Sequence, residues 1–322
     1  MFSSAGYNAS SFTLDLSDWN TSSVTSMGQM FMFAGYNAPS FALDLSDWNT
    51  SSVTSMNQMF SSAGYSATTW SIGDLSSWNT SSVTTMASMF SSAGYSATTW
   101  SIGDLSSWNT SSVTTMASMF YSAGYNAPSF ALDLSDWNTS SVTDMGSMFR
   151  YAGYSATTWS IGNLSSWNTS SVTNMSIMFA YAGYSATTWS IGNLSSWNTS
   201  SVTSMNQMFY YAGYSATAWS IGNLSSWDTS SVTSMGGMFN YAGYSASSFI
   251  LDLSSWNTSN VTGMSNIFQY AGNSATTWRI TIPKTNNGTT TGSITNTTSR
   301  FYGKTTSVYG TPRSGKSFTL AN

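Results

Sequence analysis

One polar position recurs in nine successive repeats of this chain and carries six of its 11 Asp residues. If the repeats stack as parallel strands about 4.8 Å apart, neighbouring unit charges at this position repel by about 3.5 kcal/mol at an effective dielectric constant of about 20. Hydrogen bonds to Ser and Thr, raised pKa values, the asparagines within the series or bound Ca²⁺ would relieve that repulsion. The series consists of Asp15, Asp44, Asp74, Asp104, Asp133, Asn163, Asn193, Asn223 and Asp252.

Hydrogen bonding explains this series better than calcium, because one carboxylate per repeat does not complete the roughly six to eight oxygen ligands that Ca²⁺ prefers. We therefore assign no metal and no cofactor, and keep Ca²⁺ on the Asp residues as the open alternative. The nine outward residues are the candidate binding residues of the protein.

A second carboxylate lies three residues further on in some repeats, at Asp18, Asp47 and Asp136. Carboxylate pairs hydrolyse glycosidic bonds, but a pair that is reiterated along an exposed array lacks the pocket and the tuned partner of an active site. The chain also has no His, Cys or Glu. A thiolate nucleophile, a His-activated Ser and a His-based zinc site are therefore absent, and we expect no catalytic residues and no enzyme activity.

The elements that position these residues come from a repeat of 29 or 30 residues. A fixed period of this length predicts a solenoid, in which each unit buries its apolar side chains only against its neighbours. Residues 59–88 and 89–118 are identical, which indicates that the array changes length by duplication. Met-Phe pairs begin at residues 1, 30, 59, 89, 119, 148, 178, 208 and 238, and Ile267-Phe268 ends the series.

Within a unit, the alternation of apolar and polar residues from Leu14 to Ser17 predicts a strand with Thr13, Asp15 and Ser17 facing outward. The capping residues Asn20-Thr21-Ser22 then precede apolar residues at three- and four-residue spacing from Val24 to Phe31. This pattern predicts a short amphipathic helix that ends at Gly35. Each rung is therefore expected to contain one strand and one helix.

The longer units carry one additional glycine, as in Trp70-Ser71-Ile72-Gly73-Asp74, whereas the shorter ones read like Phe12-Thr13-Leu14-Asp15. An extra glycine within a strand pattern predicts a β-bulge. We expect the larger indole to fill the space that the bulge creates.

Aromatic and Met positions recur with the repeat and predict continuous columns of stacked side chains. The Trp and Met positions follow the apolar periodicity, so we expect them in the core. One Tyr position follows the glycine, and either packs in the turn or contacts a ligand. Its members are Tyr7, Tyr36, Tyr65, Tyr95, Tyr125, Tyr154, Tyr184, Tyr214 and Tyr244.

Charge divides the chain into two parts. Residues 1–278 hold all 11 Asp and a single base, Arg150, whereas residues 279–322 hold six bases and no acid. We expect a repeat solenoid over residues 1–278 and a small β-rich C-terminal cap over residues 279–322 that closes the open end of the stack. The less favoured alternative is a cap whose six positive charges also dock on an acidic copy or an anionic cell-wall polymer. The acidic array argues against nucleic-acid binding, and no run of about 18 apolar residues is present to span a membrane.

The run from Leu43 to Phe60, Leu-Asp-Leu-Ser-x-Trp-Asn-Thr-Ser-x-Val-Thr-x-Met-x-x-Met-Phe, closely resembles the repeat of BspA-like leucine-rich-repeat surface proteins, which also occurs in mycoplasma lipoproteins. The resemblance covers residues 1 to about 278. It implies a leucine-rich-repeat solenoid outside the cell, on the bacterial surface, and a role in adhesion to host proteins and other cells. Rungs of that family are commonly shorter and carry a Cys after Met-Phe, where this chain has Ala-Gly-Tyr and extra turn residues.

We therefore expect an α/β solenoid, a leucine-rich-repeat-like stack of about ten strand–helix rungs about 45 Å long. Met1-Phe2 lies in register with the internal pairs and shows no signal-peptide pattern, so we expect a fragment or a recombinant segment, with a natural leaderless gene as the alternative.

The expected function is adhesion to, or recognition of, proteins or glycans of a host or neighbouring cell through a repeated polar face. One alternative is a structural stalk or filament subunit that self-associates end to end. Another is an ice-binding array, which is less favoured because Asp and Asn interrupt the rows of small residues.

Overall fold

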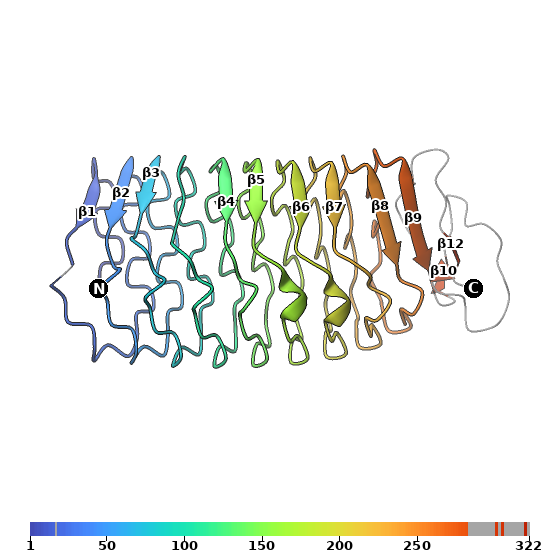
Figure 1. Ribbon diagram of the computed structural model, residues 1–322, viewed down its shortest axis with the longest axis horizontal. Helices are drawn as coiled ribbons and strands as arrows, with labels where there is room; N and C mark the ends of the chain where they lie inside the picture. Colours follow the sequence, from blue (N-terminus) through green and yellow to red (C-terminus); the bar gives the residue numbers. More distant parts are fainter. Residues whose placement is uncertain (17, 283–299, 302–303, 306–318, 321–322) are drawn as a thin grey trace.

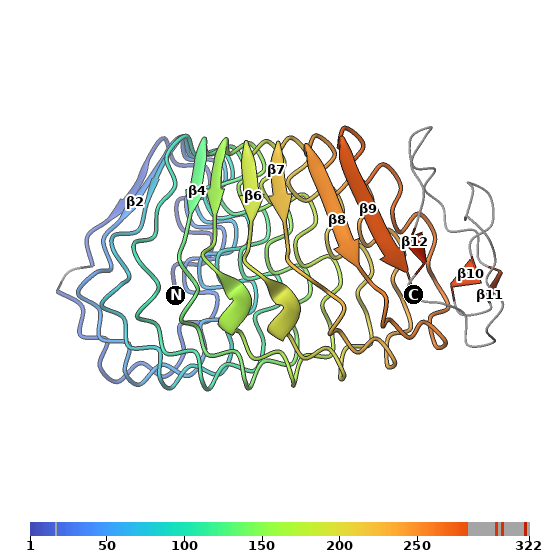
Figure 2. The same cartoon turned by 45° about the vertical axis from the view of Figure 1, so that its right-hand side comes forward.

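Short parallel strands occupy the same place in successive turns of the chain and stack into a solenoid of about nine turns (Figures 1 and 2). The computed structural model describes residues 1–16, 18–282, 300–301, 304–305 and 319–320. Eight strands belong to the repeats, and a ninth continues them: β1 (Phe12–Leu14), β2 (Ser40–Leu43), β3 (Thr69–Ser71), β4 (Ser129–Ala131), β5 (Thr158–Ser160), β6 (Thr188–Ser190), β7 (Ala218–Ser220), β8 (Ser248–Asp252) and β9 (Thr277–Ile282).

Neighbouring strands pair in parallel and in register, so equivalent residues lie one above the other. Phe41 of β2 pairs with Phe12 of β1 on one side and with Trp70 of β3 on the other. A second line of parallel bridges joins the opposite part of each turn, through Ser26, Ser55, Thr85, Thr115, Asp144, Asn174, Ser204, Ser234 and Gly263. The predicted solenoid is therefore confirmed.

The predicted helix from Val24 to Phe31 is wrong, because this segment forms a series of tight turns. The Met30 N–H donates to the Met27 carbonyl at 3.2 Å, three residues back, whereas the Phe31 N–H donates to Met59 of the next rung at 2.9 Å. Gln29 has a φ of 58°, in the left-handed region that a right-handed helix excludes. Among the described residues, the helical elements are two short 3₁₀ turns, η1 (Leu164–Ser166) and η2 (Leu194–Ser196). The rungs are therefore not strand–helix units.

Local preference and stacking explain why the turns replace a helix. A helix of so few residues is marginal by itself, and Ser, Thr, Asn and Gly are poor helix formers. In the observed turns, alternate N–H groups reach the next rung, which satisfies the backbone while Met27, Phe31 and Ala34 remain fully buried. The apolar residues at three- and four-residue spacing thus face the core without a helix.

The predicted capping residues form an Asx turn instead of a helix cap. The Asn20 side-chain oxygen accepts a hydrogen bond from the Ser22 N–H at 3.1 Å. The Thr residue of this segment is buried, and in the next rung the Thr50 hydroxyl donates to the Asn79 carbonyl of the following rung at 3.0 Å. The Asn-Thr-Ser segment therefore turns the chain and also ties rungs together.

The additional residue of the longer rungs is a glycine in the left-handed region. Gly73 has a φ of 82°, and a Cβ atom there would lie 2.5 Å from the Asp44 carboxylate of the preceding rung. The register resumes beyond it, since the Thr50 hydroxyl donates to the Asn79 carbonyl as the Thr21 hydroxyl donates to the Asn49 carbonyl, both at 3.0 Å. Only glycine fits this extra position without strain.

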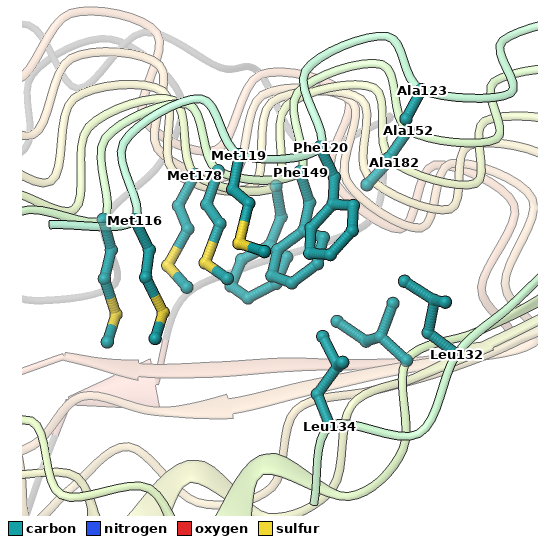
Figure 3. Close-up of a cluster of buried hydrophobic side chains, with 14 of the residues drawn as sticks. Met116, Met119, Phe120, Ala123, Leu132, Leu134, Phe149, Ala152, Met178 and Ala182 are labelled. Carbon is teal, nitrogen blue, oxygen red and sulfur yellow. The ribbon is translucent and has the colours of Figure 1, made fainter. Parts of the chain in front are cut away.

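Met, Phe, Ala and Leu columns from facing walls fill the core (Figure 3). Met116, Met119 and Phe120 point from the turn segments towards Leu132 and Leu134 on the facing side, and equivalent residues of adjacent rungs lie directly behind them. Centroids of neighbouring rings in the Phe column are 5.4–5.7 Å apart. The predicted Met core is confirmed.

Trp residues stack in a second buried column and also link rungs by hydrogen bonds. The Trp78 indole N–H donates to the Leu45 carbonyl of the preceding rung at 2.9 Å, and Trp167 donates to Leu134 at the same distance. From Trp48 to Trp256 the members of this column are at most 4% exposed, whereas Trp19 in the first rung is 41% exposed. The indole is thus a core side chain with a polar group that only the stack satisfies.

The strand β9 runs through residue 278 without a break and pairs in parallel with β8 up to Thr281. Its other edge pairs with β12 (Thr319–Leu320), and β10 (Arg300–Phe301) forms an antiparallel pair with β11 (Lys304–Thr305). The rest of the predicted β-rich cap, with Lys284, Arg313 and Lys316, lies outside the described residues. Within the described part, no helix is long and apolar enough to cross a membrane.

Candidate binding surfaces

The predicted Asp and Asn series lies where the strands end, and each member except Asp252 is exposed. The strands begin earlier than predicted, so β1 ends at Leu14 and Asp15 follows it. From Asp44 onward, each side chain accepts a hydrogen bond from the backbone N–H of the Ser two residues later. The series is therefore a column of Asx turns.

These hydrogen bonds outweigh the repulsion between neighbouring carboxylates. The Ser46 hydroxyl and N–H both donate to Asp44 and lower its pKa, although the charge of Asp15 acts in the opposite direction. The N–H of Ser106 likewise lowers the pKa of Asp104. Hydrogen bonding thus stabilises the charged carboxylates of Asp44 and Asp104, and the expected alternative of a raised pKa is wrong for these two residues.

Among the described residues, no group of three or more carboxylates is placed to hold a metal ion. The second carboxylate position is also exposed, at Asp18, Asp47 and Asp136. Where this position is Ser, its hydroxyl binds the neighbouring rung, as Ser77 donates to the Ser46 carbonyl at 2.6 Å. The structure thus gives this position a structural role in the rungs that carry Ser.

A row of exposed threonines, which was not predicted from the sequence, runs along the solenoid without interruption. From Thr54 onward each hydroxyl donates to the backbone carbonyl of the preceding Thr at 3.0–3.1 Å, as from Thr54 to Thr25. The row consists of Thr25, Thr54, Thr84, Thr114, Thr143, Thr173, Thr203, Thr233 and Thr262.

The Tyr series of the sequence forms a stacked column at the surface, which we call the first tyrosine column. Its nine rings, from Tyr7 to Tyr244, have centroids 4.4–4.9 Å apart and interplanar angles of 3–15°. All are half-buried except Tyr7, which is exposed. The rings therefore pack in the turn and also face solvent along their edges.

A second tyrosine column stands beside the first in the C-terminal half of the solenoid. Its rings are 4.3–4.9 Å apart along the column and 5.5–6.3 Å from the first column. Tyr121 makes an edge-to-face contact at its N-terminal end, and Tyr210 packs beside Tyr211. The column consists of Tyr151, Tyr181, Tyr211, Tyr241 and Tyr270.

We call the area from Tyr121 to Tyr270, with both columns and Tyr210, the tyrosine surface. Its second column was not predicted from the sequence, because that column does not follow the repeat throughout. The equivalent residues of the first five rungs are Ser4, Phe33, Ser62, Ser92 and Ser122. The change from Ser to Tyr three residues after Met148, and in each later rung, is the signal that identifies it.

The second column occupies backbone positions that disfavour large side chains. Its five tyrosines have φ values of 56–60°. A left-handed conformation costs an ordinary residue about 1–2 kcal/mol, and bulky side chains adopt it least readily. Stacking on neighbouring rings offsets part of this cost.

Burial keeps these hydroxyls protonated to high pH. The pKa of Tyr125, Tyr181 and Tyr211 is raised far above the usual value of 10.0, first by burial and then by neighbouring tyrosines. The pKa of Tyr154 and Tyr184 is raised for the same reasons. These five tyrosines therefore remain hydroxyl donors over the physiological pH range.

Arg150, the one base of residues 1–278, lies within the tyrosine surface. Its guanidinium carbon is 5.6 Å from the ring centroid of Tyr121 and 5.1 Å from that of Tyr151. Its Nε atom is buried and has no hydrogen-bond partner in the part of the chain that the structure describes. A positive charge is thus held against two rings by cation–π contacts.

A family model described as "Mycoplasma protein of unknown function, DUF285" matches the chain in overlapping segments, at residues 1–94, 32–159, 95–213 and 183–306. These matches follow the repeats from end to end. No curated protein and no solved structure matches the chain.

Proposed function

We propose that this chain, which belongs to the DUF285 family of Mycoplasma repeat proteins, is a non-enzymatic recognition protein of the bacterial cell surface. It adheres to proteins or glycans of a host or neighbouring cell along one side of the solenoid. The resemblance of Leu43–Phe60 to BspA-like surface repeats, which are associated with adhesion, supports this proposal.

The observation that carries the proposal is the tyrosine surface. Twelve tyrosines, ten of them in the two columns, lie at least partly exposed on the stack, in addition to the buried Phe and Trp columns. Repetition at every rung provides many weak contacts that add together when a partner is itself extended or multivalent. The Asp and Asn column has less to offer, because its side chains are already occupied by Ser.

Adhesion of coated beads tests the proposal. Beads that carry the full chain are expected to bind cultured epithelial cells and immobilised matrix glycoproteins above beads that carry serum albumin, and antibodies are expected to label the protein on intact cells. Absence of both adhesion and surface labelling would contradict the proposal. Electron microscopy of the same preparation checks the filament alternative, which long unbranched fibres would favour.

Ice binding is the second candidate function, favoured by the uninterrupted threonine row. Its nine exposed side chains recur once in every rung along the solenoid. Each hydroxyl from Thr54 onward already donates to a backbone carbonyl, which leaves methyl groups and acceptor lone pairs towards solvent. Thermal hysteresis of a solution of the purified chain tests this function. If ice in that solution grows at its melting temperature, with no hysteresis, the function is excluded.

A further inference from the structure

The tyrosine columns leave no ring face free along their length. An aromatic ring attracts sugar C–H groups, nucleobases and cations chiefly through its face. A molecule inserted between two rings needs about 7 Å, twice a van der Waals contact of about 3.5 Å. Neighbouring rings of the second column are only 4.3–4.9 Å apart, so each face is covered by the next ring. Edges and hydroxyl groups remain for a partner.

We propose that the partner held at the tyrosine surface is a protein, in a patch that is uncharged or acidic and rich in hydrogen-bond acceptors. This inference rests on the proposed recognition function and deepens it by choosing proteins over glycans. Ring edges and phenol hydroxyls, presented in rows, contact backbone carbonyls, carboxylates and apolar side chains of another protein.

The composition of the surface supports a protein partner. The interface cores of protein complexes are depleted of charge and enriched in Tyr and Arg, and antibody combining sites use Tyr with Ser, Gly and Asn. The turn segments at residues 121–126, 150–155, 180–185, 210–215, 240–245 and 269–274 hold Tyr, Ser, Ala, Gly, Asn, Gln and one Arg, and no Asp. This acid-free strip is the part of an acidic solenoid that another acidic protein approaches with least repulsion.

The surface is also organised before a partner arrives. The second-column rings from Tyr151 to Tyr241 are held by stacked neighbours and by the first column, as Tyr211 is held by Tyr181, Tyr214 and Tyr241. Such rings lose little rotamer freedom on binding. Five successive tyrosines occupy left-handed positions where this chain elsewhere places Ser. That backbone strain serves the exposed rings, because it adds nothing to the shared core.

Arg150 makes the N-terminal end of the tyrosine surface different from its C-terminal end. It lies at the N-terminal end of the second column, against Tyr121 and Tyr151, and its buried Nε lacks a partner within the described residues. A partner carboxylate that approaches this end is attracted by the positive charge of the guanidinium. Partners with a carboxylate there are therefore preferred over neutral ones.

Parallel selections on the immobilised full chain test the inference. One probe is a phage-displayed library of short random peptides, and the other is an array of neutral and acidic oligosaccharides. The test variant changes Tyr181→Ser, Tyr211→Ser and Tyr241→Ser, which introduces the residue that the chain itself carries at Ser62, Ser92 and Ser122. The control variant changes Thr157→Ser, Thr187→Ser and Thr217→Ser on another exposed row, where the chain has Ser247 in the next rung.

Peptides enriched on the natural chain are expected to bind the test variant about tenfold or more weakly and the control variant equally. Acidic peptides are expected to lose several-fold in affinity on Arg150→Ala, which copies the Ala180 of the next rung. Equal melting temperatures show that the variants fold.

Three outcomes would overturn the inference: no enriched peptide, peptides that bind the test variant with unchanged affinity, or oligosaccharides whose binding is lost in that variant. The last outcome would leave the recognition function standing and assign the surface to glycans. Failure of the bead adhesion assay, in contrast, removes the function itself.

Discussion

The first 120 residues and residues 121–270 share one scaffold but differ in the surface that the turns present. Both regions stack the same buried Phe and Trp columns and use the same left-handed turn positions. The position three residues after the Met of each Met-Phe pair holds mostly Ser in the first region. In the second region this position holds Tyr in five consecutive rungs. The comparison shows that the inter-rung hydrogen bonds and the core determine the fold, whereas the turn side chains vary and determine what the surface contacts.

Removal of a core ring gives the largest expected effect, of similar size in both regions. Phe60→Ala and Phe209→Ala each delete a fully buried ring from the Phe column. Each is expected to lower the free energy of unfolding by about 3–5 kcal/mol, since a cavity replaces the ring. Urea denaturation of the two variants measures this, and a loss confined to one region would contradict a common scaffold.

Removal of an indole N–H gives a smaller effect, again in both regions. Trp78→Phe removes the indole donor of the Leu45 carbonyl, and Trp197→Phe does the same at Leu164, where both indole bonds are 2.9 Å long. Each carbonyl keeps one backbone donor at 3.2 Å, from Trp48 and Trp167 respectively. The loss of the indole bond is therefore expected to lower the free energy of unfolding by about 0.5–1.5 kcal/mol. If either variant unfolds at the same urea concentration as the natural chain, the indole bonds do not contribute to rung stacking.

Alkaline pH is expected to distinguish the two regions. The folded-state pKa of Tyr181, Tyr211 and Tyr241 is raised above 10.0, mainly by burial, so their stabilisation is complete below pH 10.0 and is lost as the pH rises further. The melting temperature should therefore fall above about pH 10, and less steeply in the triple Tyr→Ser variant. Phenolate absorbance that develops at the pH of free tyrosine would contradict the burial of these rings.

Exchange of an Asp for Asn in the Asx turns should have the smallest effect. At neutral pH, Asp44→Asn is expected to leave the melting temperature unchanged, because Asn163 accepts the same hydrogen bond elsewhere in the array. The folded-state pKa of Asp44 is lowered, so its contribution is present above about pH 4 and lost as the pH falls. The natural chain should then lose stability towards low pH slightly faster than the variant, and a reversed order would contradict the hydrogen-bonded turn.

The sequence predicted the solenoid and its core because these depend on the period alone. Every Met-Phe pair recurs at 29 or 30 residues, and stacking is the one arrangement that buries all of them. Gly73 was likewise recognisable as an inserted residue, because a glycine within a strand pattern typically marks a bulge or a close approach of another backbone.

The turns could not be predicted in the same way. Apolar residues at three- and four-residue spacing, such as Met27 and Phe31, face the core in a helix and equally in the observed turns. What decides between them is the hydrogen bond from each alternate N–H to the next rung, which a single repeat does not contain. The second tyrosine column could not be predicted from the repeat, because the first five rungs have Ser4, Phe33, Ser62, Ser92 and Ser122 at the equivalent positions.

Transfer of the tyrosines from one region to the other tests the central claim most directly. The affinity of a peptide selected on the natural chain would be measured for a variant that combines Tyr181→Ser, Tyr211→Ser and Tyr241→Ser with Ser62→Tyr, Ser92→Tyr and Ser122→Tyr. A common scaffold with a separable surface predicts that binding, lost in the Ser variant, returns at the N-terminal rungs while the melting temperature is unchanged. Binding that stays lost in this folded variant would contradict the claim that the surface is carried by these side chains on interchangeable rungs.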